Sequence, residues 1–311
     1  KLWEDCENKV HIDLVYVRYI AAVDTVQQTF EIAMGLEMSW RASSADRKRY
    51  EKNPYEYIPD FVPNYEFPNA KSEDRETRAH QDGSSYKIIQ DENDGEYYNC
   101  MRPLVYLTCM ERFELWSFPF DVQELTVTMD TPFYDMSVKK TMYVPPRGAF
   151  RIDEEASKEV KVVQDGEPLP GKLVILNRAF SAIPQFRARR VVIEFAARSD
   201  PGEEDDDDAY QYGQLVIRFQ LERRFEGYLW RIAFLSILLA VTALTCFTLE
   251  VDQFAERQAM LMTLILASVA FQYVVQAELP AVPYVVLLEK LTIATFVSNI
   301  LLLCLVSLVS S

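Results

Sequence analysis

The stretch LWRIAFLSILLAVTALTCFTL at residues 229–249 is the first of three apolar runs, and together these runs decide the fold class of the chain. The second run is QAMLMTLILASVAFQYVV at 258–275, and the third spans 285–309. At ~1.5 Å per residue, helices of these lengths can cross a hydrocarbon layer of ~30 Å. The only charged residues in the three runs are Arg231, Glu289 and Lys290. A buried helix of a soluble protein is the alternative for each run, but three such runs close together favour three membrane helices.

The rest of the chain, 1–228, is polar and acidic, and it carries most of the formal net charge of −15 in this 311-residue protein. The sequence therefore predicts a soluble domain at 1–228 joined to a membrane domain at 229–311, with helices at about 229–249, 258–277 and 285–309. An acidic surface argues against a nucleic-acid partner, because phosphate backbones are bound by basic patches.

Catalytic motifs are missing from the sequence. The nine glycines form no G-x-G arrangement, and there is no G-x-S-x-G elbow. Two histidines, His11 and His80, are too few for a His-rich zinc site. Of the five cysteines, Cys6, Cys100 and Cys109 lie in the polar part, which leaves room for at most one internal disulfide among them. No enzyme activity and no cofactor are expected.

Period-two alternation of apolar residues recurs through the polar part and predicts β-strands. One strand is expected to bury Val10, Ile12, Leu14 and Tyr16 on one face, and a second runs from Phe30 through Met38 to Trp40. Further strands are predicted around Leu125, Val127 and Met129, over 191–195, and around Leu215, Ile217, Phe219 and Leu221. Many half-buried strands without long helical patterns predict a β-sandwich. The polar stretch 69–96 is expected to be an extended surface insertion.

The second apolar run carries a stripe of small and polar residues at helical spacing. A helix uses such a face either to pack tightly against another helix or to line water, and the spacing alone leaves both interpretations open. A carboxylate at the foot of the stripe favours the second, because rings of carboxylates concentrate cations at the mouths of cation channels. The predicted pore-lining residues are Glu256, Ala259, Thr263, Leu266, Ala270, Tyr273 and Ala277.

Several motifs then resemble those of one known family. Trp116–Gln123 (WSFPFDVQ) is similar to the F-P-F-D-x-Q signature of the pentameric ligand-gated ion channels, the Cys-loop receptor superfamily. Residues 24–30 (DTVQQTF), followed ten residues later by Trp40, resemble the first two strands of the family, and 58–60 (IPD) resembles its W-x-P-D loop. Arg223 and Arg224, Glu256 and Arg257, Leu266, and 279–284 (LPAVPY) follow in family order. The resemblance covers nearly the whole chain.

Three features depart from the family pattern. Glu111 and Leu125 stand where the two cysteines of the signature loop would lie, as in prokaryotic members of the family without that disulfide. The first membrane helix lacks the usual proline. A fourth membrane helix is absent from this chain, and the native protein is expected to continue through a cytoplasmic loop into that helix.

The resemblance implies a homopentamer in the cell membrane, with an immunoglobulin-like β-sandwich domain outside the cell or in the periplasm. It further implies a small extracellular ligand bound between subunits, and a central pore through which monovalent cations pass. Leu266 would form a hydrophobic constriction, with Thr263 as a polar ring below it. The residues implied in coupling ligand binding to gating are Asp24, Pro119, Phe120, Asp121, Arg223 and Pro280. The alternative for the charged members is a solvated surface position.

The ligand site is expected to involve aromatic residues, because the family holds cationic amines by cation–π contact. The residues expected there are Tyr97, Tyr98, Phe180, Tyr210 and Tyr212. The acidic run Glu203–Asp208 has two interpretations. Its like charges repel and favour a solvated segment, or it attracts a cation, an amine or Ca²⁺, with Asp205, Asp206, Asp207 and Asp208 as oxygen ligands.

A second function class stays open beside the channel. A membrane-anchored β-sandwich that acts as a receptor or adhesion protein without conducting ions fits the same two-part organisation. It gives no reason for a continuous polar stripe on the second helix, nor for Glu256 at its foot.

Overall fold

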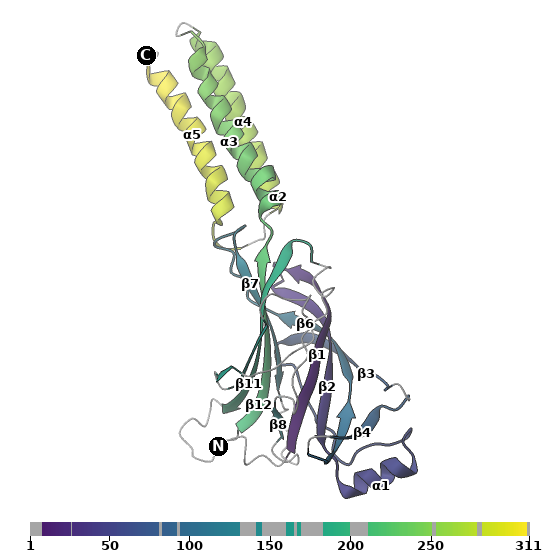
Figure 1. Ribbon diagram of the computed structural model, residues 1–311. Coiled ribbons are helices and arrows are strands. Elements are labelled where there is room, and N and C mark those ends of the chain that lie inside the picture. The colour runs from purple at the N-terminus through teal and green to yellow at the C-terminus, as the bar shows by residue number, and fades with distance from the viewer. Residues whose placement is uncertain are drawn as a thin grey trace. The chain divides into compact units, whose positions relative to one another are not determined.

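The computed structural model describes residues 8–25, 27–80, 83–91, 94–130, 141–144, 160–164, 167–168, 183–199, 211–250, 253–278 and 282–309. The chain divides into two compact units. The first comprises 1–24, 28–112 and 124–221, and the second comprises 25–27, 113–123 and 222–311. The first unit consists mainly of β-sheet, and the second contains the apolar helices (Figure 1).

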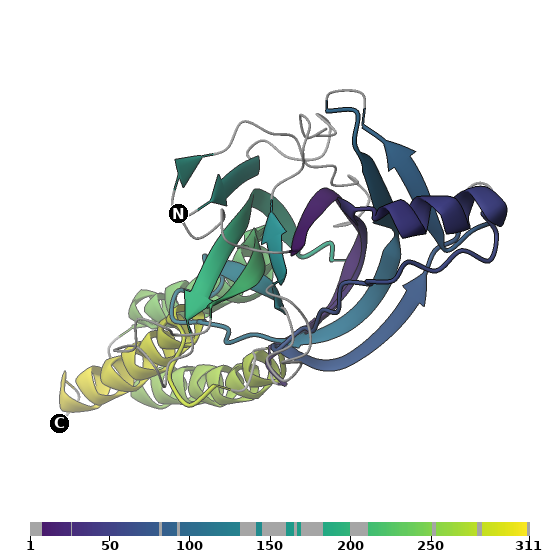
Figure 2. The same cartoon turned by 90° about the horizontal axis from the view of Figure 1, so that it is seen from below.

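Two curled sheets make up most of the first unit (Figures 1 and 2). In the described residues, one sheet has the order β3 (Ala70–Thr77), β6 (Pro103–Met110), β2 (Thr29–Arg41), β1 (Asn8–Asp24) and β8 (Thr141–Val144), with β5 (Tyr97–Met101) pairing with β2 and with β4 (Tyr86–Gln90). The other sheet has the order β10 (Glu167–Pro168), β9 (Val160–Gln164), β11 (Phe186–Ser199), β12 (Gln211–Arg223) and β7 (Val122–Asp130).

The predicted strands are present, and most bury the predicted faces. Leu125, Val127 and Met129 of β7 are at most 1% exposed. The alternating apolar residues of β2, β11 and β12 are buried in the same way, including Phe30, Ile32, Met34, Val191, Ile193, Phe195, Leu215, Ile217, Phe219 and Leu221. Alternation predicts these faces because successive side chains of a strand point to opposite sides.

The expected face of β1 is wrong beyond Ile12. Val10 and Ile12 are buried as predicted, but Leu14 and Tyr16 are only half-buried, and the buried residues there are Val15 and Val17. The cause is a register shift between Ile12 and Leu14, where β1 has one residue more than β2. An extra residue in one strand moves every later side chain to the opposite face.

Two further corrections concern local structure. The stretch 69–96, expected to be an extended surface insertion, is exposed over 71–77, but it contains the strands β3 and β4, and β3 pairs with β6 along its length. A helix that the strand pattern did not predict, α1 (Ser44–Lys52), follows β2. It begins with a capping box in which the Ser43 side chain accepts the Asp46 N–H and the Asp46 side chain accepts the Ser43 N–H.

Three helices in the second unit are long and apolar enough to cross a membrane: Glu226–Thr248, Phe254–Ala277 and Leu287–Leu308. The first comprises α2 (Glu226–Tyr228), a π-helical turn η2 (Leu229–Ala233), α3 (Phe234–Leu244) and a 3₁₀ turn η3 (Thr245–Thr248). The other two are α4 (Phe254–Glu278) and α5 (Leu287–Val309). Figure 1 shows α3, α4 and α5 as a bundle of parallel and antiparallel neighbours. The protein is therefore a multi-pass membrane protein, as the apolar runs predict.

Candidate functional site

The loop 113–123, which carries the F-P-F-D motif, packs against the ends of the membrane helices within the second unit. The Trp116 ring stacks on the Tyr284 ring, with centroids 3.8 Å apart and planes 9° apart. The Leu115 N–H donates to the Tyr284 hydroxyl at 2.8 Å, and the Leu288 N–H donates to the Phe118 carbonyl at 3.3 Å. The loop thus contacts both the segment that precedes α5 and the first turn of α5.

A buried ion pair joins this loop to Arg223, the last residue of β12, just before the first membrane helix begins at Glu226. The Arg223 Nε lies 2.8 Å from Asp121 Oδ1, and its second nitrogen, Nη2, lies 3.1 Å from Asp121 Oδ2. The two side chains are 4% and 2% exposed. Gln123 Nε2 donates to Asp121 Oδ2 at 2.6 Å, and the Arg223 guanidinium lies 4.8 Å from the centre of the Phe118 ring. The carboxylate is therefore held on several sides, as a buried charge requires.

The other residues expected at the junction have different surroundings. Pro119 lies in the same loop, and Phe120 is 48% exposed with its ring 5.0 Å from that of Phe225. Asp24 ends β1 in the first unit, and Pro280 falls outside the described residues. The structure therefore brings Asp121 and Arg223 together directly. The role of all these residues in coupling stays a prediction.

All seven residues of the predicted stripe on α4 are exposed in the single chain, with Leu266 at 70% and Tyr273 at 71%. The fully buried residues of α4 are Leu261, Ser268 and Val275. At ~100° per residue, these three point roughly 180° away from the centre of the stripe. Packing within the chain therefore uses the opposite face of α4, and the small-residue stripe is not the contact with α3 or α5.

Packing on the buried face combines an apolar cluster with polar contacts between helices. Ala243, Cys246, Leu261 and Val306 form the cluster. Asn299 Nδ2 donates to Ser268 Oγ at 3.0 Å, and Gln258 Nε2 donates to Ser307 Oγ at 3.1 Å, so α4 and α5 are tied at two levels. Interhelical hydrogen bonds of this kind contribute ~0.6 kcal/mol on average in membranes.

Glu256 and Arg257 point in different directions at the start of α4. Glu256 is exposed in the first turn, whereas Arg257 is half-buried and its guanidinium donates to the Leu249 carbonyl before the turn into α4. The carboxylate at the foot of the stripe is therefore not paired with its neighbouring arginine. The Thr263 hydroxyl donates its hydrogen to the Ala259 carbonyl at 2.8 Å. The lone pairs of the hydroxyl oxygen therefore remain as acceptors on the side of the stripe.

The residues expected at the ligand site are described only in part. Tyr97 and Tyr98 are consecutive in β5, so their side chains point to opposite faces. The Arg47 guanidinium of α1 already lies 3.6 Å from the centre of the Tyr97 ring, and the Tyr98 hydroxyl donates to Asp94 at 2.7 Å. Tyr212 lies in β12, and Phe180 and Tyr210 fall outside the described residues.

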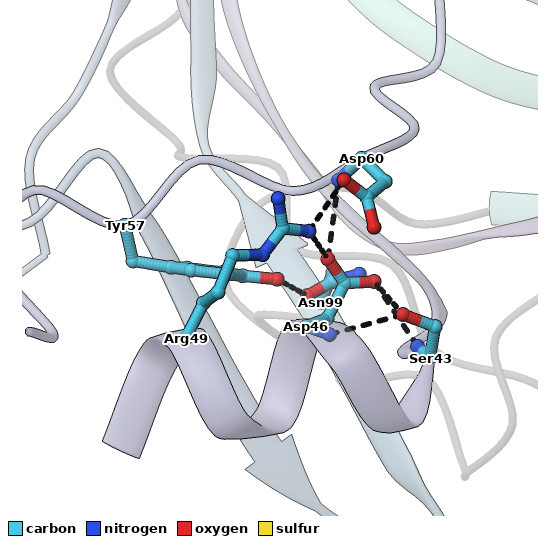
Figure 3. A network of polar contacts seen from close by, with 6 residues as sticks. All are labelled: Ser43, Asp46, Arg49, Tyr57, Asp60 and Asn99. Carbon is cyan, nitrogen blue, oxygen red and sulfur yellow. Dashed lines mark hydrogen bonds and ion pairs between the residues drawn. The ribbon is translucent and has the colours of Figure 1, made fainter. Parts of the chain in front are cut away.

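A polar network that the sequence did not reveal holds α1 against the IPD loop and β5 (Figure 3). The Arg49 guanidinium lies 2.6 Å from both Asp46 Oδ1 and Asp60 Oδ1, and the Asp60 N–H donates to Asp46 at 3.1 Å. Burial by itself raises the pKa of Asp46, but hydrogen bonds from Ser43, Asp60 and Arg49 outweigh it and lower the pKa below its ordinary value. Tyr57 completes the network by donating to Asn99 Oδ1 at 2.7 Å. The S-x-x-D spacing was a detectable signal for α1.

No metal site is visible in the described part of the chain, where no three His, Cys, Asp or Glu side chains cluster suitably. The acidic residues Asp205, Asp206, Asp207 and Asp208 fall outside that part. Cys109 is a buried free thiol, and burial raises its pKa to about 12, so this thiol stays protonated and unreactive at neutral pH.

No protein-family model matches the chain, and no curated protein matches it.

Proposed function

We propose that the chain is one subunit of a homopentameric ligand-gated ion channel of the Cys-loop receptor superfamily that selects cations. In this proposal the two sheets form an immunoglobulin-like β-sandwich outside the membrane, and a small ligand binds between neighbouring sandwiches. The proposal rests on the motif resemblance and on the surroundings of α4.

The observation that carries the proposal is the exposed stripe of α4. Glu256, Thr263 and Leu266 face away from the rest of their own chain, while the helix packs through the opposite side. Five such helices around an axis would present a carboxylate ring at one end and a leucine ring ten residues further on. A carboxylate ring attracts cations, and a narrow apolar ring closes a pore by excluding water.

The junction supports a mechanism for opening. The 113–123 loop contacts the end of β12, directly before the first membrane helix, through Asp121 and Arg223, and it contacts the segment before α5 through Tyr284. A displacement of the loop would therefore act on two membrane segments at once. In the proposed channel, ligand binding between sandwiches moves this loop and so shifts the equilibrium between closed and open pores.

Reversal potentials measured in liposomes under a salt gradient test the proposal. The purified protein should conduct, and the reversal potential of its current should lie close to the equilibrium potential of K⁺. Glu256→Ala should move the reversal potential toward the equilibrium potential of Cl⁻. The mass of the assembled oligomer should stay that of the parent. Glu289→Ala, which removes an acidic residue from the first turn of α5, is the matched control and should leave selectivity unchanged.

Two results would reject parts of the proposal. A folded, reconstituted protein that passes no ions with any ligand tested would favour the non-conducting receptor or adhesion protein. Chloride selectivity in the parent, or the same selectivity after Glu256→Ala, would remove Glu256 from the mechanism.

A further inference from the structure

A hollow of ≈ 370 Å³ lies between the first membrane helix and α4. Gly227, Tyr228, Arg231 and Leu235 line one side, and Phe271 and Val274 line the other. Its volume falls in the range of sites that bind small molecules, ~300–1,000 Å³. The lining is apolar except for the Arg231 guanidinium and the Tyr228 hydroxyl, so the hollow matches an apolar chain with one polar end.

The backbone beside the hollow departs from a regular α-helix. Leu229–Ala233 forms a π-helical turn, and the Phe234 N–H donates to the Leu229 carbonyl five residues earlier. Turns of this kind are rare and frequently lie at functional sites. No proline in this helix imposes the irregularity. Arg231, at the centre of the turn, is therefore presented by a local widening of the helix.

A glycine keeps the hollow open one turn before Arg231. A Cβ atom added to Gly227 would meet nothing within 4 Å. Because this glycine has a negative φ, no backbone requirement excludes a larger residue here. Because Gly227 lines the hollow, a bulky side chain at 227 provides a steric test of whether that space is used.

Arg231 is a cation without an anionic partner in the described part of the chain, and its side chain is exposed. Its neighbour Trp230 is 70% exposed and contacts Phe234, with ring centroids 5.6 Å apart. Exposed tryptophans on membrane helices mark the membrane–water interface, so Arg231 lies at the depth of the lipid head groups. Basic pockets between membrane helices on the cytoplasmic or matrix side bind anionic head groups, and the same chemistry applies to Arg231 at whichever membrane surface it lies.

We propose that this hollow binds one anionic phospholipid of the surrounding bilayer. The phosphate contacts the Arg231 guanidinium, and part of an acyl chain lies along Leu235, Phe271 and Val274. The alternative is that Arg231 only extends its charge to the interface while its stem covers apolar surface. That alternative predicts no preference among head groups and no effect of filling the space beside Gly227. The proposal needs only the membrane helices and is independent of ion conduction.

Native mass spectrometry of the detergent-purified chain measures bound lipid directly. The probes are phosphatidylglycerol, phosphatidylcholine with the same acyl chains, and oleate. The parent should retain phosphatidylglycerol in preference to phosphatidylcholine. Arg231→Gln should weaken this retention about fivefold, the effect of one basic residue near an anionic head group. Arg231→Lys should preserve most of it, and Gly227→Leu should abolish it although the charge is kept.

Lys290→Gln is the matched control. Lys290 is the single cation of a second apolar groove of ≈ 500 Å³ on α5, which has neither a π-helical turn nor a glycine in its lining. This variant should bind phosphatidylglycerol like the parent. Equal retention of both phospholipids, equal losses in Arg231→Gln and Lys290→Gln, or binding of oleate alone would each overturn the proposal. If Gly227→Leu does not fold, the comparison of Arg231→Gln with Arg231→Lys and Lys290→Gln decides it.

Discussion

Replacing Asp121 by Asn should weaken the contact between the 113–123 loop and Arg223 at the end of β12, just before the first membrane helix. Asn keeps the size of the side chain but removes its charge, so the buried Arg223 guanidinium loses its counter-ion. The Asn side chain replaces one of the two carboxylate oxygens by an NH₂ group. This group is a donor, and it would face the Arg223 guanidinium, which also has only donors. The hydrogen bond from Gln123 to Asp121 Oδ2, now 2.6 Å long, is disturbed by the same change.

The expected loss follows from burial. With side chains 4% and 2% exposed, Arg223 and Asp121 are desolvated, and removal of one partner from a buried pair costs about 3–5 kcal/mol. At roughly 2–4 °C per kcal/mol for a protein of this size class, the midpoint of thermal unfolding should fall by ~6–20 °C. The half-exposed pair of Arg218 and Glu194 provides the control, since Glu194→Gln should cost at most ~1 kcal/mol.

Intrinsic fluorescence during heating of the purified protein measures the loss, and channel current from the same preparation measures gating. A double variant, Asp121→Leu with Arg223→Met, replaces both charges and should recover most of the stability, because no charge is left buried and unpaired. If the ion pair also couples binding to gating, the double variant will be stable yet open poorly. An Asp121→Asn protein that melts and conducts like the parent would refute both the energetic and the functional reasoning.

Three further changes test other parts of the structure. Leu266→Thr should give channels that leak or open more easily, because a hydroxyl lowers the barrier to wetting the proposed constriction, and current without ligand measures this. The lowered pKa of Asp46 means that its carboxylate stabilises the fold fully above its ordinary pKa of 3.8 and loses that contribution as the pH falls through the lower folded-state pKa. The melting temperature of Asp46→Asn should therefore depend less on pH between about pH 5 and about pH 2 than that of the parent. Gly35→Ala should destabilise the first sheet by ~1–3 kcal/mol, since its Cβ would lie 2.1 Å from the Tyr16 ring; an unchanged urea midpoint would contradict the close approach.

Periodicity predicted the three membrane helices and the strands β1, β2, β7, β11 and β12, but it did not predict α1, β3, β4, β5 or β6. The stripe on α4 was predictable because a helix repeats every 3.6 residues, so seven positions chosen by spacing all fall on one exposed side. The strands β7 and β12 were predictable because alternate residues of a strand point to the same face. The face of β1 was not predictable past Ile12, because the extra residues lie at register shifts set by its pairing with β2.

The polar contacts were less predictable than the elements. The pairing of Asp121 with Arg223 spans 102 residues and was accessible only through motif resemblance. In the polar network of Asp46, Arg49 and Asp60, the capping box at the start of α1 could be predicted from the sequence. The ion pair between Arg49 and Asp60 could not, because it joins the helix to a loop and no residue spacing predicts it. The contact of Arg47 with Tyr97 likewise depends on how α1 lies against β5.

The exposure of the membrane helices bears on assembly. Only 17% of the apolar window of α4 is buried within the chain, against 28% for the first membrane helix and 22% for α5. A helix bordered by lipid on its free side would be expected to present apolar side chains there, but α4 presents the carboxylate of Glu256 and the hydroxyl of Thr263 on that side. Water or further protein is the environment that satisfies both residues without loss of hydrogen bonds. The least buried helix thus also carries polar side chains on its free face, and in the proposed channel a ring of subunits around a water-filled axis would expose that face to water.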